Sequence, residues 1–273
     1  MTTPTVTLNN GVVMPRIGFG VFQVPPGATA EAVSVALEAG YRSIDTAALY
    51  DNEAETGAAI RASGLARNEI FLTTKLWNDQ QGYDSALAEF DASIGRLGVD
   101  FVDLYLIHWP CPAQDRYLDT WRAFERLLED GRVRAIGVSN FQPAHLRRLL
   151  DNSGVTPAVN QIELHPLLQQ RELRAYHAAN GIATEAWSPL ARGQLLSDPT
   201  LSAIAARHDR SVAQVVLAWH LTLGNIVIPR SVTPSRIRDN LAITDITLSA
   251  DDVAAIDAMD RGERIGPNPD AFG

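Results

Sequence analysis

One amine stands out among the residues of this chain that could do chemistry. The sequence contains 22 Arg and a single Lys, Lys75, which closes the apolar, β-branched run 70–75. A charge in such a run is costly unless a carboxylate pairs with it. A guanidinium is broader and more basic than an ammonium, so Arg is a poor substitute where a compact, tunable cation is needed. We therefore predict that Lys75 is a buried functional amine and not a leftover surface residue of an Arg-rich chain.

Three further side chains could act together with this amine. Asp45 and Tyr50 follow one apolar segment, and His108 ends another. Taken singly, each has an ordinary structural role: such an Asp usually caps a helix, such a Tyr usually packs against other side chains, and such a His is usually a hydrogen-bonded residue of the core. If they converge, Asp45 supplies the counter-charge of Lys75, and the ammonium holds the pKa of the Tyr50 phenol below its free value of ~10. A phenol tuned in this way is a general acid that works near neutral pH.

The elements that must position these residues repeat along the chain. Apolar segments predicted as strands alternate eight times with amphipathic segments of helical period. The strands begin near Arg16, Tyr41, Ile70, Phe101, Val133, Ala158, Ile182 and Asn225, and the helices cover 31–39, 53–63, 85–97, 118–130, 143–151, 172–180 and 211–223. This alternation predicts an α/β fold, a closed parallel (β/α)8 TIM barrel. An open doubly wound sheet is the alternative, although Gln23 replaces the third glycine of a dinucleotide fingerprint that starts at Gly18.

Two segments lie outside the repeat. Residues 5–8 and 12–14 flank an Asn-Asn-Gly turn and predict a β-hairpin that plugs one end of the barrel. At the other end of the chain, an extra helix over 249–260 precedes a Gly- and Pro-rich tail, 261–273, that is expected to cross a barrel mouth. Since no linker or change of composition interrupts the chain, residues 1–273 are predicted to form a single domain.

Composition limits the partners of the protein. With 46% hydrophobic and 20% charged residues the chain is an ordinary globular protein, and its formal net charge of -9 argues against nucleic acid and anionic membrane surfaces. Cys111 is the only cysteine, so no internal disulfide can form and a reducing compartment is expected. The sequence shows no leader and no apolar run of ~20 residues, which favours a cytoplasmic protein without a membrane segment.

Polar and aromatic residues gather where the predicted strands end. In a parallel barrel the chemistry lies at this end, because the loops that follow the strands meet there. The residues at these positions are Asp45, Lys75, His108, Ser139, Asn140, Gln161, Trp187, Ser188, Arg230 and Ser231.

The segments that contain these residues resemble the aldo-keto reductase family. The resemblance covers nearly the whole chain and is carried by 10–11, 45–53, 74–77, 103–110, 137–141, 160–166 and 228–240. Within the family the sequence is most similar to the bacterial 2,5-diketo-D-gluconate reductase group. The resemblance implies a monomeric, NADPH-dependent enzyme that reduces the carbonyl of a small molecule to an alcohol by hydride transfer. Keto-sugars, α-dicarbonyls such as methylglyoxal and aromatic aldehydes are all possible substrates.

The family pattern also implies a role for each catalytic candidate. Tyr50 would donate the proton to the forming alkoxide, Lys75 would lower its pKa, and Asp45 would pair with Lys75. His108 would orient the carbonyl, which a neutral imidazole can do by a hydrogen bond to the carbonyl oxygen. The residues that would line the substrate pocket are Phe22, Trp77 and Trp109.

The cofactor candidates follow from the same resemblance. Trp187 would stack on the nicotinamide, the loop 191–196 would fold over the pyrophosphate, and the whole set is Gly20, Ser139, Asn140, Gln161, Trp187, Ser188, Leu190, Gly193, Arg230, Ser231, Val232, Arg236 and Asn240. Arg230 and Arg236 flank a predicted helix start, an arrangement that suits a 2′-phosphate and therefore NADPH. The family usually has Lys in place of Arg230, so the extent of NADH use stays open.

Two other functions remain open at this point. A metal-dependent barrel hydrolase or isomerase could use Asp45, His108, Glu163 and His165, whereas the resemblance itself implies no metal. A non-enzymatic subunit that senses NADPH could use the same fold without turnover.

Overall fold

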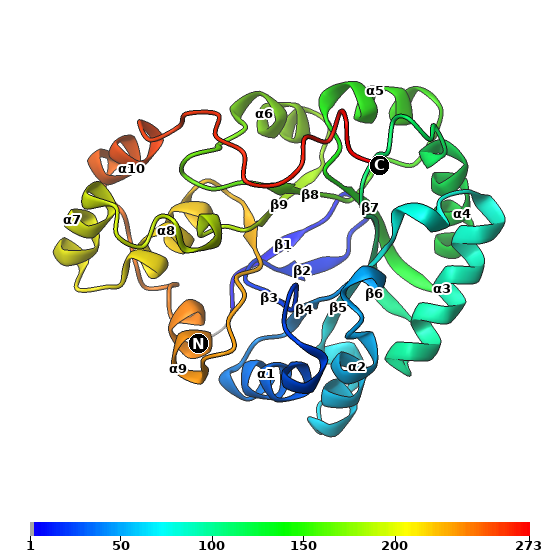
Figure 1. The fold of residues 1–273 in the computed structure, drawn as a ribbon, viewed down its shortest axis with the longest axis horizontal. Helices are drawn as coiled ribbons and strands as arrows, with labels where there is room; N and C mark the ends of the chain where they lie inside the picture. Colours follow the sequence, from blue (N-terminus) through cyan, green and yellow to red (C-terminus); the bar gives the residue numbers. More distant parts are fainter. Residues whose placement is uncertain (1–2) are drawn as a thin grey trace.

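Eight parallel strands form a barrel with helices around it (Figure 1). The computed structural model describes residues 3–273. The strands follow one another around the barrel in chain order and are β3 (Phe19–Gly20), β4 (Ser43–Asp45), β5 (Phe71–Leu76), β6 (Val102–Ile107), β7 (Val133–Ser139), β8 (Val159–Glu163), β9 (Ala183–Trp187) and β10 (Ile226–Val227). Hydrogen bonds between the first and last strands close the barrel: the Gly18 amide donates to the Val227 carbonyl (2.8 Å), and the Val227 amide donates to the Arg16 carbonyl (2.9 Å). The predicted (β/α)8 barrel is confirmed, and the open doubly wound alternative is wrong.

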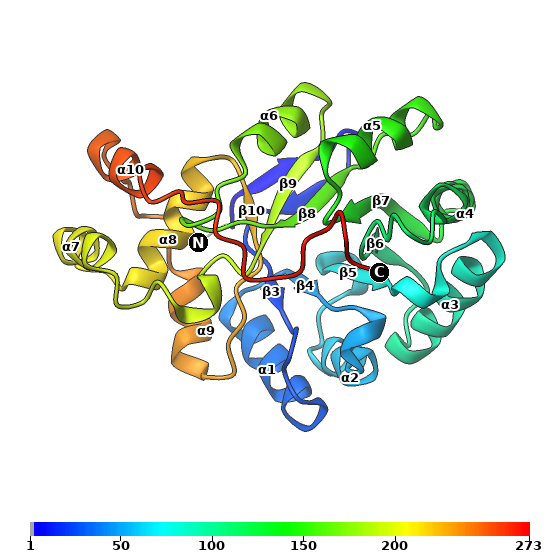
Figure 2. The same cartoon turned by 45° about the horizontal axis from the view of Figure 1, so that its top comes forward.

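The helices form an outer layer around this barrel (Figures 1 and 2). They are α1 (Pro26–Ala39), α2 (Glu53–Ala62), α3 (Tyr83–Leu97), α4 (Tyr117–Glu129), α5 (Pro143–Asp151), α6 (Arg171–Ala179), α7 (Pro199–His208), α8 (Val212–Thr222), α9 (Pro234–Leu241) and α10 (Ala250–Asp257). The strand–helix repeat predicted from the sequence did not include α7, a helix that begins directly after its N-cap residue Asp198. At the end of α1, Gly40 adopts a left-handed φ of 109°, a conformation that costs glycine little. None of the helices in residues 3–273 is both long and apolar enough to cross a membrane.

The N-terminal hairpin closes the end of the barrel where the strands begin. Its strands are β1 (Thr5–Thr7) and β2 (Val13–Pro15), paired antiparallel. Leu8 and Met14 are buried in one cluster with barrel residues such as Leu104 and Val159. The side-chain amide of Asn10 (Nδ2) also donates to the Arg134 carbonyl at the start of β7 (2.9 Å). The hairpin is therefore the predicted plug.

The C-terminal tail crosses a mouth of the barrel, as expected, and this mouth is at the end opposite the hairpin (red in Figure 2). The backbone amides of Ile265 and Gly266 donate to the two carboxylate oxygens of Glu163 at the end of β8, at 2.6 and 2.9 Å. A Cβ at Gly266 would lie 2.5 Å from the ring of Trp187, so only glycine lets the backbone pass this close. The carboxylate of Glu163 thus fixes the tail over the mouth where the strands end.

Candidate active site

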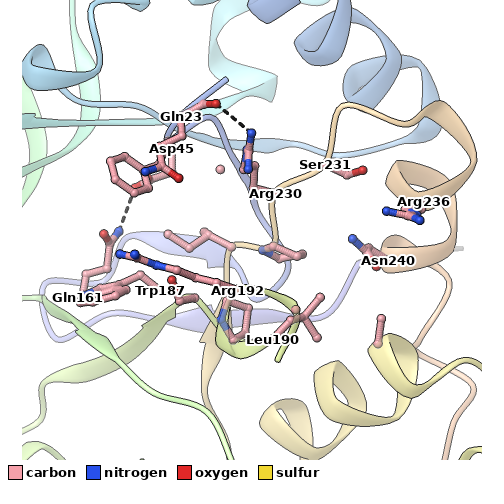
Figure 3. Close-up of a pocket in the computed structure, with 18 of the residues that line it drawn as sticks. Gln23, Asp45, Gln161, Trp187, Leu190, Arg192, Arg230, Ser231, Arg236 and Asn240 are labelled. Atoms are coloured by element: carbon pink, nitrogen blue, oxygen red, sulfur yellow. Dashed lines mark hydrogen bonds between the residues drawn. The ribbon is translucent and has the colours of Figure 1, made fainter. Parts of the chain in front are cut away.

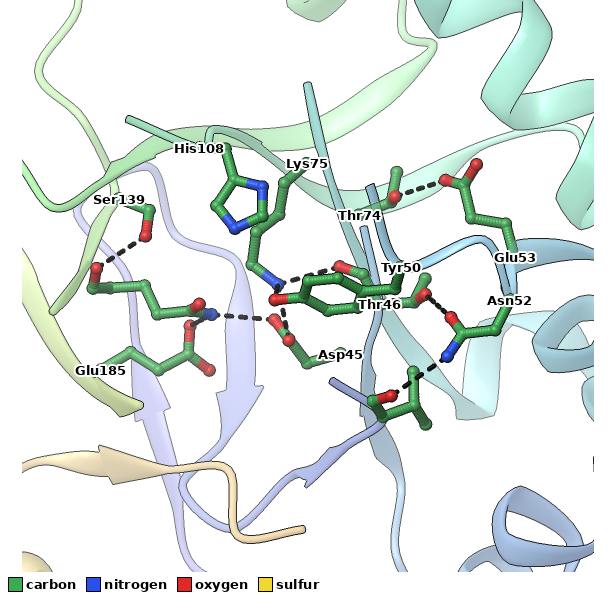
Figure 4. Close-up of polar contacts among 12 residues, drawn as sticks. Asp45, Thr46, Tyr50, Asn52, Glu53, Thr74, Lys75, His108, Ser139 and Glu185 are labelled. Carbon is green, nitrogen blue, oxygen red and sulfur yellow. Dashed lines mark hydrogen bonds and ion pairs between the residues drawn. The ribbon is translucent and has the colours of Figure 1, made fainter. Parts of the chain in front are cut away.

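The lone ammonium lies at the centre of a buried polar network (Figure 4). Lys75 is on β5 and fully buried, and its Nζ lies 2.6 Å from Asp45 Oδ1 at the end of β4. Nζ also lies 2.9 Å from the Thr46 carbonyl and 3.3 Å from the Tyr50 hydroxyl. An ammonium has three N–H donors, and each has an acceptor here. The structure thus brings together the three residues that were predicted to share a proton-transfer site.

A tight turn places the Tyr50 hydroxyl against Lys75. Tyr50 ends the short helix η1 (Ala48–Tyr50), directly after β4. The buried Asn52 secures this turn: it accepts from the Thr46 hydroxyl (2.8 Å) and donates to the Val21 carbonyl (3.0 Å). The phenol is half-buried, with its hydroxyl on the network and its ring along a cavity.

The pKa of the phenol differs from the sequence-based expectation. Burial raises the pKa of Tyr50 above 10.0; Lys75 lowers it through its charge and its hydrogen bond, and Asp45 raises it. The charge of Lys75 acts in the predicted direction, but burial outweighs it, so the predicted pKa below the free value is wrong. For Lys75 itself, burial lowers the pKa, while the charges of Asp45 and Tyr50 more than compensate and leave it raised. At neutral pH the site therefore holds an ammonium beside a protonated phenol.

His108 lies on the other side of the phenol and is uncharged. It follows β6, with its ring centroid 5.7 Å from that of Tyr50 and 5.1 Å from that of Trp77. Burial, followed by the charge of Lys75, holds the pKa of His108 well below 6.5. Within residues 3–273, His108 Nδ1 is buried without a hydrogen-bond partner. A neutral imidazole in this place can donate one hydrogen bond to an oxygen in the cavity.

A second buried carboxyl group, which sequence reasoning missed, extends the network. Glu185 lies on β9 and is fully buried, next to Gln161 on β8. Gln161 Nε2 donates both to Asp45 Oδ2 and to Glu185 Oε2, at 2.8 Å each. Burial, and then the negative charge of Asp45, raises the pKa of Glu185 to about 8. Glu185 is thus uncharged at neutral pH.

Polar contacts at the ends of β7, β8 and β9 link the predicted cofactor residues in this part of the barrel. The Ser139 hydroxyl donates to the Gln161 carbonyl (2.8 Å), and Asn140 Nδ2 donates to the Ser139 hydroxyl (3.0 Å). Asn140 Oδ1 in turn accepts from the indole nitrogen of Trp187 (2.8 Å). These bonds fix the orientation of the Trp187 ring beside Gln161.

All of these side chains border or underlie a cavity of about 810 Å³ (Figure 3). Most of the predicted site residues line it: Gly20, Phe22, Asp45, Tyr50, His108, Trp109, Ser139, Asn140, Gln161, Trp187, Ser188, Leu190, Gly193, Arg230, Ser231, Arg236 and Asn240. Lys75 lies beneath its floor. Val232 is half exposed and does not line the cavity, and Trp77 stands behind His108.

The cavity is long and has two chemically different ends. Figure 3 shows Gln161 and Trp187 at one end, Ser231, Arg236 and Asn240 at the other, and Arg192 between them. Arg236 and Asn240 project from α9, whose N-terminus favours anions. Arg230 is already anchored, since it donates to the Gln23 carbonyl (2.8 Å). An extended ligand with an aromatic head and an anionic far end fits this shape, as the expected dinucleotide does.

Aromatic rings enclose the space in front of Tyr50 and His108. Phe22 lies 5.0 Å from the Tyr50 ring, between ring centroids. Phe272 of the tail lies 4.6 Å from Trp109 and 6.4 Å from Trp77. Neither Trp77 nor Phe272 lines the cavity itself; Phe272 packs on Trp109, which does, and Trp77 packs on both His108 and Phe272. Sequence reasoning missed Phe272, although it expected the tail to cross a barrel mouth.

The alternative metal site lacks its ligand set. The carboxylate of Glu163 binds the tail amides and His165 Nε2, the latter at 3.0 Å. Over the described range 3–273, His, Cys, Asp and Glu side chains form no group of three or more that could hold a metal ion. The proposed quartet of Asp45, His108, Glu163 and His165 therefore does not gather around one point.

Comparisons with known proteins agree with this geometry. The model of the Aldo/keto reductase family matches residues 16–261. The glyoxal reductase of Bacillus subtilis (strain 168) is 54% identical over 267 residues, which cover 97% of this chain and 96% of that protein. The methylglyoxal reductase DkgA of Yersinia pestis is 50% identical over 272 residues, with 99% and 98% covered. The crystal structure of a mutant of Gox0644 in complex with NADPH is 49% identical, with a TM-score of 0.96 and 100% of both chains covered.

Proposed function

Because this chain belongs to the aldo/keto reductase family and is an NADPH-dependent oxidoreductase that reduces carbonyl groups, we propose a substrate class and a proton donor for it. The substrates are small α-dicarbonyls, and Tyr50 is the proton donor. The proton donor is assigned from one observation at the floor of the cavity: Lys75 Nζ contacts both Asp45 and the Tyr50 hydroxyl. The two relatives named glyoxal and methylglyoxal reductase support the choice of substrate.

The proposed mechanism divides the reaction between the cofactor and the network. NADPH, when bound, supplies a hydride to the carbonyl carbon. The Tyr50 hydroxyl gives its proton to the carbonyl oxygen, and the adjacent Lys75 ammonium stabilises the phenolate that remains. The uncharged His108 donates a hydrogen bond to the same oxygen and so holds the carbonyl in place. Asp45 keeps Lys75 charged and positioned.

The residues at both ends of the cavity support this binding mode. Trp187, Asn140 and Gln161 would hold the nicotinamide, and Ser231 and Arg236 would hold the adenosine phosphate. A substrate would then lie between Phe22 and Trp109, in front of the Tyr50 hydroxyl, with Phe272 packed on Trp109. Such an aromatic enclosure suits a small, uncharged carbonyl compound.

A substrate panel tests the proposed specificity. NADPH consumption would be measured with glyoxal, methylglyoxal, 2,5-diketo-D-gluconate and benzaldehyde, each over a range of concentrations. We expect the two small dicarbonyls to give the highest kcat/KM, because they fit the aromatic enclosure without displacing Phe272. A preference for the keto-sugar or for the aromatic aldehyde would contradict the substrate proposal and would leave the proton donor untouched.

The Arg236→Ala variant tests the proposed 2′-phosphate site. A hydrogen bond to a charged group contributes about 1.5–3 kcal/mol, so NADPH binding should weaken roughly 10- to 100-fold. NADH has no 2′-phosphate, and its binding should change little. Quenching of tryptophan fluorescence would give both dissociation constants. Arg238→Ala is the matched control, because Arg238 is exposed on the same helix but does not line the cavity. Equal losses for NADPH and NADH would reject the assignment.

A further inference from the structure

The buried Glu185 has no place in the mechanism given so far. Its carboxyl group is fully buried and lies across from Asp45, with the side-chain amide of Gln161 between them (Figure 4). Gln161 Nε2 has two hydrogens, and the two carboxyl groups accept them. The Gln161 amide is therefore held on both sides by carboxyl oxygens.

This arrangement fixes which atom of Gln161 faces the cavity. Gln161 lines the cavity, and with Nε2 occupied the remaining polar atom of its side chain is the acceptor Oε1. The opposite orientation would turn Oε1 toward the carboxylate of Asp45, an acceptor against an acceptor. Gln161 is thus set to accept a hydrogen bond from a donor in the cavity, such as a carboxamide NH2.

We propose that Glu185 is a positioning residue for carbonyl reduction, which holds the Gln161 amide with its oxygen toward the nicotinamide end of the cavity. The proposal rests on the function given above, in which Gln161 binds the cofactor and Tyr50 donates the proton. Glu185 acts only through other side chains, because it does not line the cavity itself.

The charge of Glu185 adds a second consequence. The titratable groups that face it are Asp45 on β4, Lys75 on β5 and Tyr50 on η1. Because the pKa of Glu185 is about 8, it is uncharged at neutral pH and ionises above that pH. Its negative charge then raises the pKa of Tyr50, which makes the phenol a weaker acid. Reduction by the wild-type enzyme should therefore start to slow as the pH passes about 8.

Two substitutions separate these effects. In Glu185→Leu the Gln161 amide loses one acceptor, and we expect NADPH to bind roughly 3- to 10-fold more weakly, the net contribution of a hydrogen bond. In Glu185→Gln the new side-chain oxygen can still accept from Gln161, so NADPH affinity should stay within about twofold. This variant cannot ionise, so the decline that starts near pH 8 should be lost.

A double-mutant cycle shows whether Glu185 acts through Gln161. Gln161→Leu and the double variant with Glu185→Leu would be compared by fluorescence titration with NADPH. If Glu185 acts through Gln161, the second substitution adds no further loss of affinity. Additive losses would indicate a structural role only and would overturn the proposal.

These experiments can be interpreted even if a variant does not fold or if the proposed substrate is wrong. If Glu185→Leu does not fold, the Glu185→Gln variant decides: an unchanged decline near pH 8 would overturn the role assigned to its charge. If no dicarbonyl is reduced, the substrate proposal fails, whereas the titrations with NADPH still test Glu185 and Gln161. Wild-type NADPH affinity in a folded Glu185→Leu variant would reject the positioning role outright.

Discussion

The Tyr50→Phe variant should lose carbonyl reduction by ~10²- to 10⁴-fold, the usual contribution of a positioned general acid. The ring would keep its contacts with Phe22 and His108, while the hydroxyl next to Lys75 that is proposed to donate the proton would be gone. NADPH affinity should stay within a few-fold, because the hydroxyl is not among the groups proposed to bind the cofactor. Single-turnover reduction of methylglyoxal, together with a fluorescence titration, would measure both effects.

His108→Asn is the useful comparison for this variant. Its loss should be smaller, because His108 is assigned only a hydrogen bond to the carbonyl oxygen, and its effect should fall mainly on KM and on the orientation of the substrate. If Tyr50→Phe kept wild-type activity, another residue or a water molecule would have to supply the proton, and the proposed role of Tyr50 would be abandoned.

Replacing Lys75 by methionine should damage both activity and stability. Asp45 would remain buried and, among residues 3–273, would keep only the Gln161 amide as a side-chain donor. The loss of one partner of a buried ion pair costs about 3–5 kcal/mol. The phenolate left by proton transfer would lose its neighbouring charge as well, so reduction should fall at least as far as in Tyr50→Phe. Urea unfolding would give the change in the free energy of unfolding.

A double variant separates the two losses. Lys75→Met combined with Asp45→Asn removes both charges, so most of the lost stability should return, while activity should not. If the single Lys75→Met variant proved as stable as wild type, the 2.6 Å contact with Asp45 could not be the main stabilising interaction of this network. Recovery of activity in the double variant would argue against any role of the ammonium in proton transfer.

The fold and the central network could be predicted from the sequence because both depend on strong, local signals. Strands buried on both faces give continuous apolar runs, and in a parallel barrel the ends of such runs must meet. The one lysine in an Arg-rich chain pointed to Lys75, and the contact between Lys75 and Asp45 is confirmed. The hairpin was expected to plug one end of the barrel and the tail to cross a barrel mouth, and the structure has both.

The sequence could not give what depends on the packing of distant segments. Glu185 follows Thr184 within a strand and carries no motif, and only the closed barrel brings it next to Gln161 and Asp45. Phe272 is an isolated aromatic residue in the tail until the tail crosses the mouth. The pKa of Tyr50 depends on burial as much as on charge, and the residues near it in sequence do not reveal that burial.

The complete burial of the only lysine gives the protein a built-in reporter of structural opening. Reagents that acylate primary amines can reach the ε-amino group of Lys75 only when β5 and the turn around Tyr50 open. Apart from the α-amino group, no other amine in the chain competes for the reagent. The rate at which mass spectrometry detects this single modification would therefore measure how often the active site opens, without any engineered label.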